Sequence, residues 1–152
     1  MTSSASARVS LGVDLLGVVA RLNRLATQRT PLPLPWAQAR LLGTIDDQGP
    51  TRICHLAALD HCSQPTMTMQ VRRLEDAGLV TRTPDPADAR AVLIEITPAG
   101  IDTLHRVRAD RASVIDPYIT ALDHEDQQTL AAAVRVLQGL LDDAASHGRT
   151  NK

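Results

Sequence analysis

Apolar residues recur every three or four positions along the first third of the chain, which is the spacing that gathers them on one face of a helix. A first series consists of Leu11, Leu15, Val18, Leu22 and Leu25. A second series, entered at Pro35, consists of Trp36, Ala39, Leu42 and Ile45. Prolines between positions 31 and 35 separate the two series, and the turn signal at residues 48–50 ends the second. The pattern therefore predicts two amphipathic helices.

Two short helices are predicted next, each beginning at a hydroxyl residue that can accept a hydrogen bond from an unpaired backbone N–H. Thr51 is the predicted cap of a helix with apolar residues from Ile53 to Leu59. Ser63 is the predicted cap of a second helix, whose apolar stripe is Met67, Val71 and Leu74. This helix is expected to end at Gly78, because glycine adopts the left-handed conformation after a helix at no steric cost.

A β-hairpin is predicted after the fourth helix. Residues 79–82 have the character of a strand, residues 85–90 of a polar turn, and residues 92–96 of a second strand rich in β-branched side chains. The hairpin leads to Thr97 and Pro98, which supply the N-cap and first-turn proline of a long helix.

The last third of the chain is predicted to be helical. Pro117 is expected to kink or break the long helix, and Asp123 to cap a final helix with a polar tail from Ser146. Apolar residues of this final helix repeat at Leu130, Val134, Leu137 and Leu141. The predicted fold is mostly α (α+β): four helices, a hairpin and two helices in one domain of residues 1–152.

Composition and charge add modest constraints. Aromatic residues make up 1% of the chain, so the core is expected to be aliphatic. The formal net charge of −1 counts mildly against a polyanion-binding protein, because nonspecific DNA affinity comes from neutralised phosphates. The first ten residues lack the features of a signal peptide and no long apolar run occurs, so a cytoplasmic location with reduced Cys54 and Cys62 is expected.

Two short helices joined by a tight turn are typical of a helix-turn-helix, whose second helix enters the DNA major groove. Gln64 can bond adenine, threonine and proline can contact a thymine methyl group, and arginine can bind guanine or phosphate. The alternative is the ordinary polar face of a helical bundle, and the helices alone favour neither. The hairpin favours DNA, because it can act as a wing whose tip carries Arg90 into a minor groove, with Asp88 holding the arginine side chain.

Three segments together resemble the MarR family of regulators. They are residues 63–80 (SQPTMTMQVRRLEDAGLV), residues 85–90 (DPADAR) and residues 96–100 (ITPAG). The resemblance implies a winged helix-turn-helix at residues 34–97, with dimerisation helices at residues 8–30 and 98–146. The sequence departs from the family pattern at two positions: Met69 stands where an arginine is frequent, and Gln70 stands where an apolar residue is frequent.

The resemblance implies a homodimeric, ligand-responsive repressor that binds a palindromic operator in double-stranded DNA. Gln64, Pro65, Thr66 and Thr68 match base or phosphate contacts, Arg73 a backbone contact, and Asp88 with Arg90 the wing. With the exposed residues of the same helix added, the predicted DNA-binding residues are Ser63, Gln64, Pro65, Thr66, Thr68, Met69, Arg72, Arg73, Asp88 and Arg90.

Dimerisation is also predicted from the apolar stripes at the two ends of the chain, which exceed what one small winged domain can cover. The predicted dimerisation residues are Leu11, Leu15, Leu130, Val134, Leu137 and Leu141. An effector pocket between the winged part and the dimerisation helices is implied by the resemblance. Its predicted lining, for an anion beside apolar walls, is Leu15, Trp36, Arg40, His105 and Arg108, although these residues equally suit simple helix packing.

Other functions are weighed against this one. Cys54-His55 and His61-Cys62 suggest a metal or thiol sensor, but their spacing matches no recognised zinc pattern, so no metal or other cofactor is predicted. Neither a Gly-x-Ser-x-Gly nucleophile motif nor a glycine-rich phosphate loop occurs, and an enzyme is not expected. A winged helix that binds another protein instead of DNA remains an alternative.

Overall fold

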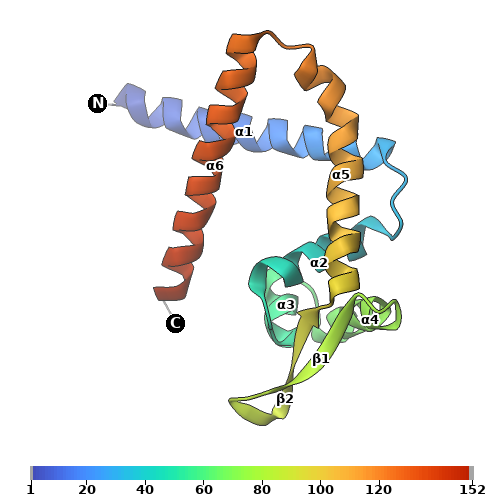
Figure 1. Cartoon of the computed structure of the whole chain (residues 1–152). Helices are drawn as coiled ribbons and strands as arrows, with labels where there is room; N and C mark the ends of the chain where they lie inside the picture. Colours follow the sequence, from blue (N-terminus) through green and yellow to red (C-terminus); the bar gives the residue numbers. More distant parts are fainter. Residues whose placement is uncertain (1, 151–152) are drawn as a thin grey trace. The chain divides into compact units, whose positions relative to one another are not determined.

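The computed structural model describes residues 2–150 and the side chains of residues 10–146 (Figure 1). The chain divides into two compact units, of which the first ends at Val114 and the second begins at Ile115. The elements are α1 (Thr2–Arg29), α2 (Trp36–Gln48), α3 (Ile53–Leu59), α4 (Gln64–Asp76), β1 (Val80–Asp85), β2 (Asp88–Ile96), α5 (Pro98–Thr120) and α6 (His124–Thr150). The predicted element order and mostly helical fold are confirmed.

The core lies where α2, α3 and α4 meet the hairpin. Its most deeply buried side chains, each at most 1% exposed, are Leu42, Ile45, Leu56, Met67, Val71, Leu74 and Ile94. The apolar stripe predicted for α4 therefore faces inward, and aliphatic side chains fill the space as the composition requires. Burial of such side chains contributes about 1.5–3 kcal/mol each, so this cluster fixes α4 firmly in place.

Three of the predicted helix caps are confirmed. Ser63, Thr97 and Asp123 each accept a hydrogen bond from the backbone N–H three residues further along, at 3.3, 3.1 and 2.8 Å. Gly78 has a φ of +71° directly after the C-cap of α4, as its left-handed role requires. These signals are local in the sequence, and the structure follows them.

The predicted cap at Thr51 is wrong. Arg52 occupies the N-cap position of α3, and its side chain makes no capping bond. Thr51 instead forms an antiparallel bridge with Ile94 of β2, with backbone N–O distances of 3.1 and 2.8 Å in the two directions. The backbone groups of Thr51 are thus satisfied by the hairpin, which ties the start of α3 to β2.

The hairpin turn is shorter than predicted. β1 and β2 pair antiparallel from Val80 opposite Ile96, with an irregularity after Pro84, and only residues 86–87 lie between the strands. The turn closes early because the Asp85 carboxylate accepts a hydrogen bond from the Ala87 N–H at 2.8 Å. Arg90 consequently lies on β2 and not at the tip of the hairpin, which projects from the helices in Figure 1.

The last two helices are longer than predicted. α5 does not break at Pro117 but continues to Thr120. The Pro117 carbonyl accepts a hydrogen bond from the Ala121 N–H at 3.2 Å, so helical hydrogen bonding extends past the proline. The predicted polar tail from Ser146 is helical, and the Ser146 hydroxyl donates to the Asp142 carbonyl at 2.8 Å. Within the described residues, no helix combines the length and apolar character needed to cross a membrane.

Gly100 allows the first turn of α5 to lie against the connection between α4 and β1. A Cβ atom at this position would lie 2.1 Å from the Leu79 carbonyl oxygen and 2.7 Å from Ile96 Cγ1. The Gly100→Ala substitution is therefore expected to lower the free energy of unfolding by about 3 kcal/mol, because backbone must move to make room. Urea denaturation of the purified protein measures this loss.

Gly43→Ala on α2 is the matched control, because its Cβ would lie 3.8 Å from the nearest heavy atom, Leu104 Cδ1. The control is expected to change stability by no more than about 1 kcal/mol, in the stabilising direction, since alanine favours helix. Equal effects of the two substitutions would contradict the close approach at Gly100.

Candidate nucleic-acid interface

The surface of α4 is polar on the side opposite the core. Of the predicted DNA-binding residues, Ser63 caps α4, Asp88 and Arg90 lie on β2, and the others lie on α4. All ten are exposed: Ser63, Gln64, Pro65, Thr66, Thr68, Met69, Arg72, Arg73, Asp88 and Arg90. The structure therefore presents two groups of accessible side chains, one on the second helix of a helix-turn-helix and one on a wing.

The hydroxyl groups at the start of α4 are partly held by local hydrogen bonds. Ser63 Oγ lies 2.8 Å from Thr66 Oγ1, and the Thr68 hydroxyl donates to the Gln64 carbonyl at 2.8 Å. The Thr68 hydroxyl hydrogen is thereby used within the helix, which leaves its oxygen lone pairs and its methyl group for an external partner.

A hollow joins the start of α4 to the wing. Its lining consists of Arg52, Ile53, Cys54, Gln64, Ala91 and Val92. The first residue of the recognition helix therefore lies beside the middle of β2, close to Arg90 along the strand. The start of α4 and the middle of β2 therefore belong to one continuous surface.

Asp88 has different partners from those predicted. One of its carboxylate oxygens accepts a hydrogen bond from the Arg90 backbone N–H at 3.1 Å. The other lies 3.8 Å from Nη2 of Arg52. Asp88 thus shapes the backbone at the start of β2, and the structure shows this contact in place of the predicted bond to the Arg90 guanidinium.

Arg52 and Asp85 form an ion pair that the sequence analysis missed. Arg52 Nε and Nη2 donate to Asp85 Oδ2 at 2.8 and 2.5 Å, while Asp85 Oδ1 accepts from the Ala87 N–H. The Ala87 N–H and the Arg52 guanidinium together hold the pKa of the Asp85 carboxyl below its ordinary value. The same pair raises the pKa of Arg52. No sequence signal indicated a partner 33 residues away.

The end of α4 is fixed to the hairpin as well. Arg82 Nε on β1 lies 2.9 Å from Glu75 Oε2 on α4. The Thr97 hydroxyl, at the end of β2, donates to the Gly78 carbonyl at 2.7 Å. Both contacts lie at the C-terminal end of α4, while Gln64 at its start shares a hollow with β2, so the recognition helix and the wing form one frame.

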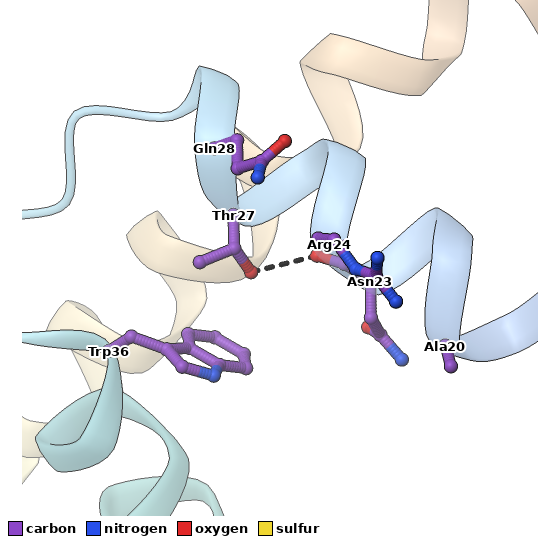
Figure 2. A pocket seen from close by; sticks show the side chains of 6 residues that line it. All are labelled: Ala20, Asn23, Arg24, Thr27, Gln28 and Trp36. Carbon is purple, nitrogen blue, oxygen red and sulfur yellow. Dashed lines mark hydrogen bonds between the residues drawn. The ribbon is translucent and has the colours of Figure 1, made fainter.

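A second hollow, of about 320 Å³, lies between α1 and α2. Figure 2 shows the Trp36 indole beneath one side of α1, and the residues that line the hollow are Ala20, Asn23, Arg24, Thr27, Gln28 and Trp36. The Thr27 hydroxyl donates to the Asn23 carbonyl at 2.8 Å, so this hydroxyl is turned toward its own helix. The hollow combines an aromatic wall with amide and guanidinium groups.

Arg111 of α5 stacks on the same tryptophan. Its guanidinium carbon lies 4.2 Å from the Trp36 ring centroid, and its Nη2 donates to Asn23 Oδ1 at 2.9 Å. Burial lowers the pKa of Arg111. Its Nε is buried and has no hydrogen-bond partner among the described residues. This cation is therefore incompletely satisfied, which is costly unless a further acceptor approaches.

Of the five predicted effector-pocket residues, Trp36 lines this hollow and the other four do not. The Arg40 guanidinium donates to both Asp60 oxygens at 2.5 and 2.7 Å, and that of Arg108 lies 3.4 Å from Asp46. Leu15 is half-buried on α1, and His105 is exposed on α5.

Of the cysteines, Cys54 is exposed and Cys62 is half-buried against the core. His55 Nε2 lies 3.3 Å from Gln48 Oε1. Over the part of the chain that the structure describes, no three His, Cys, Asp or Glu side chains come together as metal ligands.

The predicted dimerisation residues lie on accessible apolar surfaces. On α1, Leu11 is 69% exposed and Leu15 half-buried; on α6, Leu141 is 70% exposed and Leu137 half-buried. Leu130 and Val134 of α6 are also exposed. Groups of exposed apolar side chains are typical of protein–protein contact surfaces.

Comparison with known proteins agrees with this architecture. Residues 34–92 match the model of the MarR family. An uncharacterised HTH-type transcriptional regulator of Mycobacterium bovis is 28% identical over 135 residues, which cover 88% of this chain and 94% of that protein. A 27% identical HTH-type regulator of Bacillus subtilis covers 66% of this chain and 68% of its own length.

Among solved structures, a transcriptional regulator from Thermotoga maritima is 28% identical with a TM-score of 0.69, covering 90% of this chain and 97% of its own. The match to the MarR family model spans the helix-turn-helix and most of the wing, and the chain is similar over nearly its whole length to HTH-type transcriptional regulators.

Proposed function

We propose that this protein is a sequence-specific DNA-binding repressor that binds a palindromic operator as a homodimer and is released by a small-molecule effector. The observation that carries the proposal is the frame formed by α4 and the wing, in which Gln64 and the middle of β2 line one hollow. Regulators of this family bind DNA and function as dimers, which supports the same conclusion.

The exposed face of α4 supplies the major-groove contacts. Gln64 has an amide that can bond the N6 and N7 edge of adenine, and Arg72 and Arg73 bring positive charge further along the helix. Met69 adds an apolar, flexible contact in place of a charged one. Operator preference is therefore expected to depend on Gln64 more than on the residue at position 69.

Arg90 supplies the minor-groove contact. It is exposed on β2, and Asp88 fixes its backbone through the bond to the Arg90 N–H. Negative potential is concentrated in a narrow minor groove, where an inserted guanidinium is stabilised.

The Arg90→Ala substitution is expected to weaken operator binding about 10- to 100-fold, since a well-placed arginine contact contributes about 1–3 kcal/mol. The melting temperature should change little, because the residue contributes nothing to the core. Fluorescence anisotropy with a duplex enriched from random DNA measures the dissociation constant. Arg106→Ala, which removes the same charge from an exposed position of α5, is the control and should bind nearly as wild type. Equal affinities of the Arg90 variant and wild type would exclude the wing contact.

Dimerisation is proposed to cover the apolar residues of α1 and α6. A palindromic site requires two winged helix-turn-helix units related by two-fold symmetry, and one unit alone makes half of the contacts.

Leu141→Asp is expected to give a monomer that binds the operator more than about 100-fold more weakly, because linkage of the two units is lost. Gly139→Asp adds the same charge to the same helix, where a Cβ meets nothing within 4 Å, and should remain a dimer. Analytical ultracentrifugation measures the mass of each variant. A dimeric Leu141→Asp protein with full affinity would place the interface elsewhere.

The hollow beside Trp36 is the proposed effector site, and its chemistry suits an aromatic carboxylate. Trp36 offers an apolar wall, and Arg24 lines the hollow with a guanidinium that can pair with a carboxylate. Arg111 stacks on the same indole without lining the hollow. A volume of about 320 Å³ falls within the range of small-molecule sites, about 300–1,000 Å³.

Trp36 is the single tryptophan of the chain, so its fluorescence reports binding at this hollow directly. Benzoate is expected to quench the emission and to lower operator affinity, whereas the neutral benzamide should do neither, since the site selects the charge. Arg24→Gln should abolish the benzoate response and retain operator binding. Identical responses to benzoate and benzamide, or an unchanged response of the Arg24 variant, would contradict an anion site at this position.

A further inference from the structure

Residues 51 and 52 attach the wing to the start of α3 at two separate points. Thr51 pairs through its backbone with Ile94 near the base of β2. Arg52 reaches the opposite end of the hairpin, where both Nε and Nη2 donate to Asp85 Oδ2. Two neighbouring residues therefore hold the hairpin near its root and near its turn.

Asp85 connects this attachment to the shape of the turn. Asp85 is 8% exposed, and its two carboxylate oxygens have different partners: Oδ1 accepts from the Ala87 N–H and Oδ2 accepts from Arg52. Asp88 adds a second carboxylate, 3.8 Å from Arg52 Nη2, and bonds the Arg90 N–H with its other oxygen. The Arg52 guanidinium thus faces both carboxylates of the segment that leads to Arg90.

The hairpin has little else to orient it at this end. Residues 86–90 are exposed, and a two-stranded hairpin is at best marginally stable by itself in water. The side chains that pack into the core, Val80 and Ile94, lie toward its root. Among the residues that the structure describes, Arg52 consequently provides the side-chain contact that restrains the turn end relative to Gln64.

We infer that Arg52 is a positioning residue, which holds the wing so that Arg90 and Gln64 meet DNA at a fixed separation. The inference rests on the proposed function, because it assigns Arg52 a role in operator binding without contact to DNA. Its charge is compensated by Asp85 and Asp88, which favours positioning over phosphate binding. A wing held in place before binding loses less conformational freedom when the complex forms.

The test is a double-mutant cycle in the full-length protein, with Arg52→Gln, Arg90→Ala and both together, titrated against one selected duplex. Arg52→Gln alone is expected to bind about 3- to 10-fold more weakly, which is less than the loss for Arg90→Ala. In the Arg90→Ala background the same change should cost less than about twofold, because Arg52 acts through Arg90. Arg106→Gln, with the same loss of charge on α5, is the control.

Three further readouts separate positioning from the other roles. The dependence of affinity on salt should be unchanged in Arg52→Gln, whereas loss of a phosphate contact would reduce the slope. Hydroxyl-radical protection of the minor groove beside each half-site should weaken while the central footprint persists. Arg52→Lys, which retains the charge and one contact, should restore part of the affinity. If Arg52→Gln fails to fold, Asp85→Asn tests the same pair, because its amide oxygen still accepts from Ala87.

An equal loss for Arg52→Gln in the wild-type and Arg90→Ala backgrounds, or a reduced salt slope, would overturn the inference and leave the proposed function standing. Failure of the random pool to yield any enriched duplex would instead overturn the proposed function. The selection therefore tests the proposed function, and the titrations test the role of Arg52.

Discussion

Burial of the apolar stripe of α4 is the constraint on which the rest of the structure depends. Met67, Val71 and Leu74 are at most 1% exposed, and they pack with Leu42 and Ile45 of α2 into an aliphatic core. Once these side chains face inward, the rotation of the helix about its axis is fixed, and its polar residues face solvent apart from Gln70, whose Oε1 is buried. The recognition surface follows from the packing of the opposite face.

The wing depends on the same core and adds contacts of its own. Ile94 packs among the α4 residues, and the Thr51 bridge and the Arg52–Asp85 pair fix the hairpin to α3. Helix and wing therefore form one frame. Under the proposed function, an effector bound beside α1 would act on the placement of this whole frame, and release from a palindrome would follow a change in the separation of two such frames.

The elements and caps could be predicted from sequence because their causes are local. The spacing of Met67, Val71 and Leu74 defines a helix face, and Ser63 and Gly78 act within a few residues of where they stand. The bridge from Thr51 and the ion pair of Arg52 were missed, because their partners are brought close only by the tertiary fold. Trp36 was predicted to line a pocket. The residues of α1 that lie beside it were not, because the relative position of two packed helices cannot be predicted from the sequence of either helix.

The most direct measurement is selection of bound duplexes from a random DNA pool, followed by titration of the enriched duplex at two salt concentrations. The account predicts a palindromic motif with half-sites about one helical turn, 10–10.5 base pairs, apart, and an affinity that falls as salt rises. No enrichment even at low salt would contradict it and would indicate that the exposed face of α4 binds another protein.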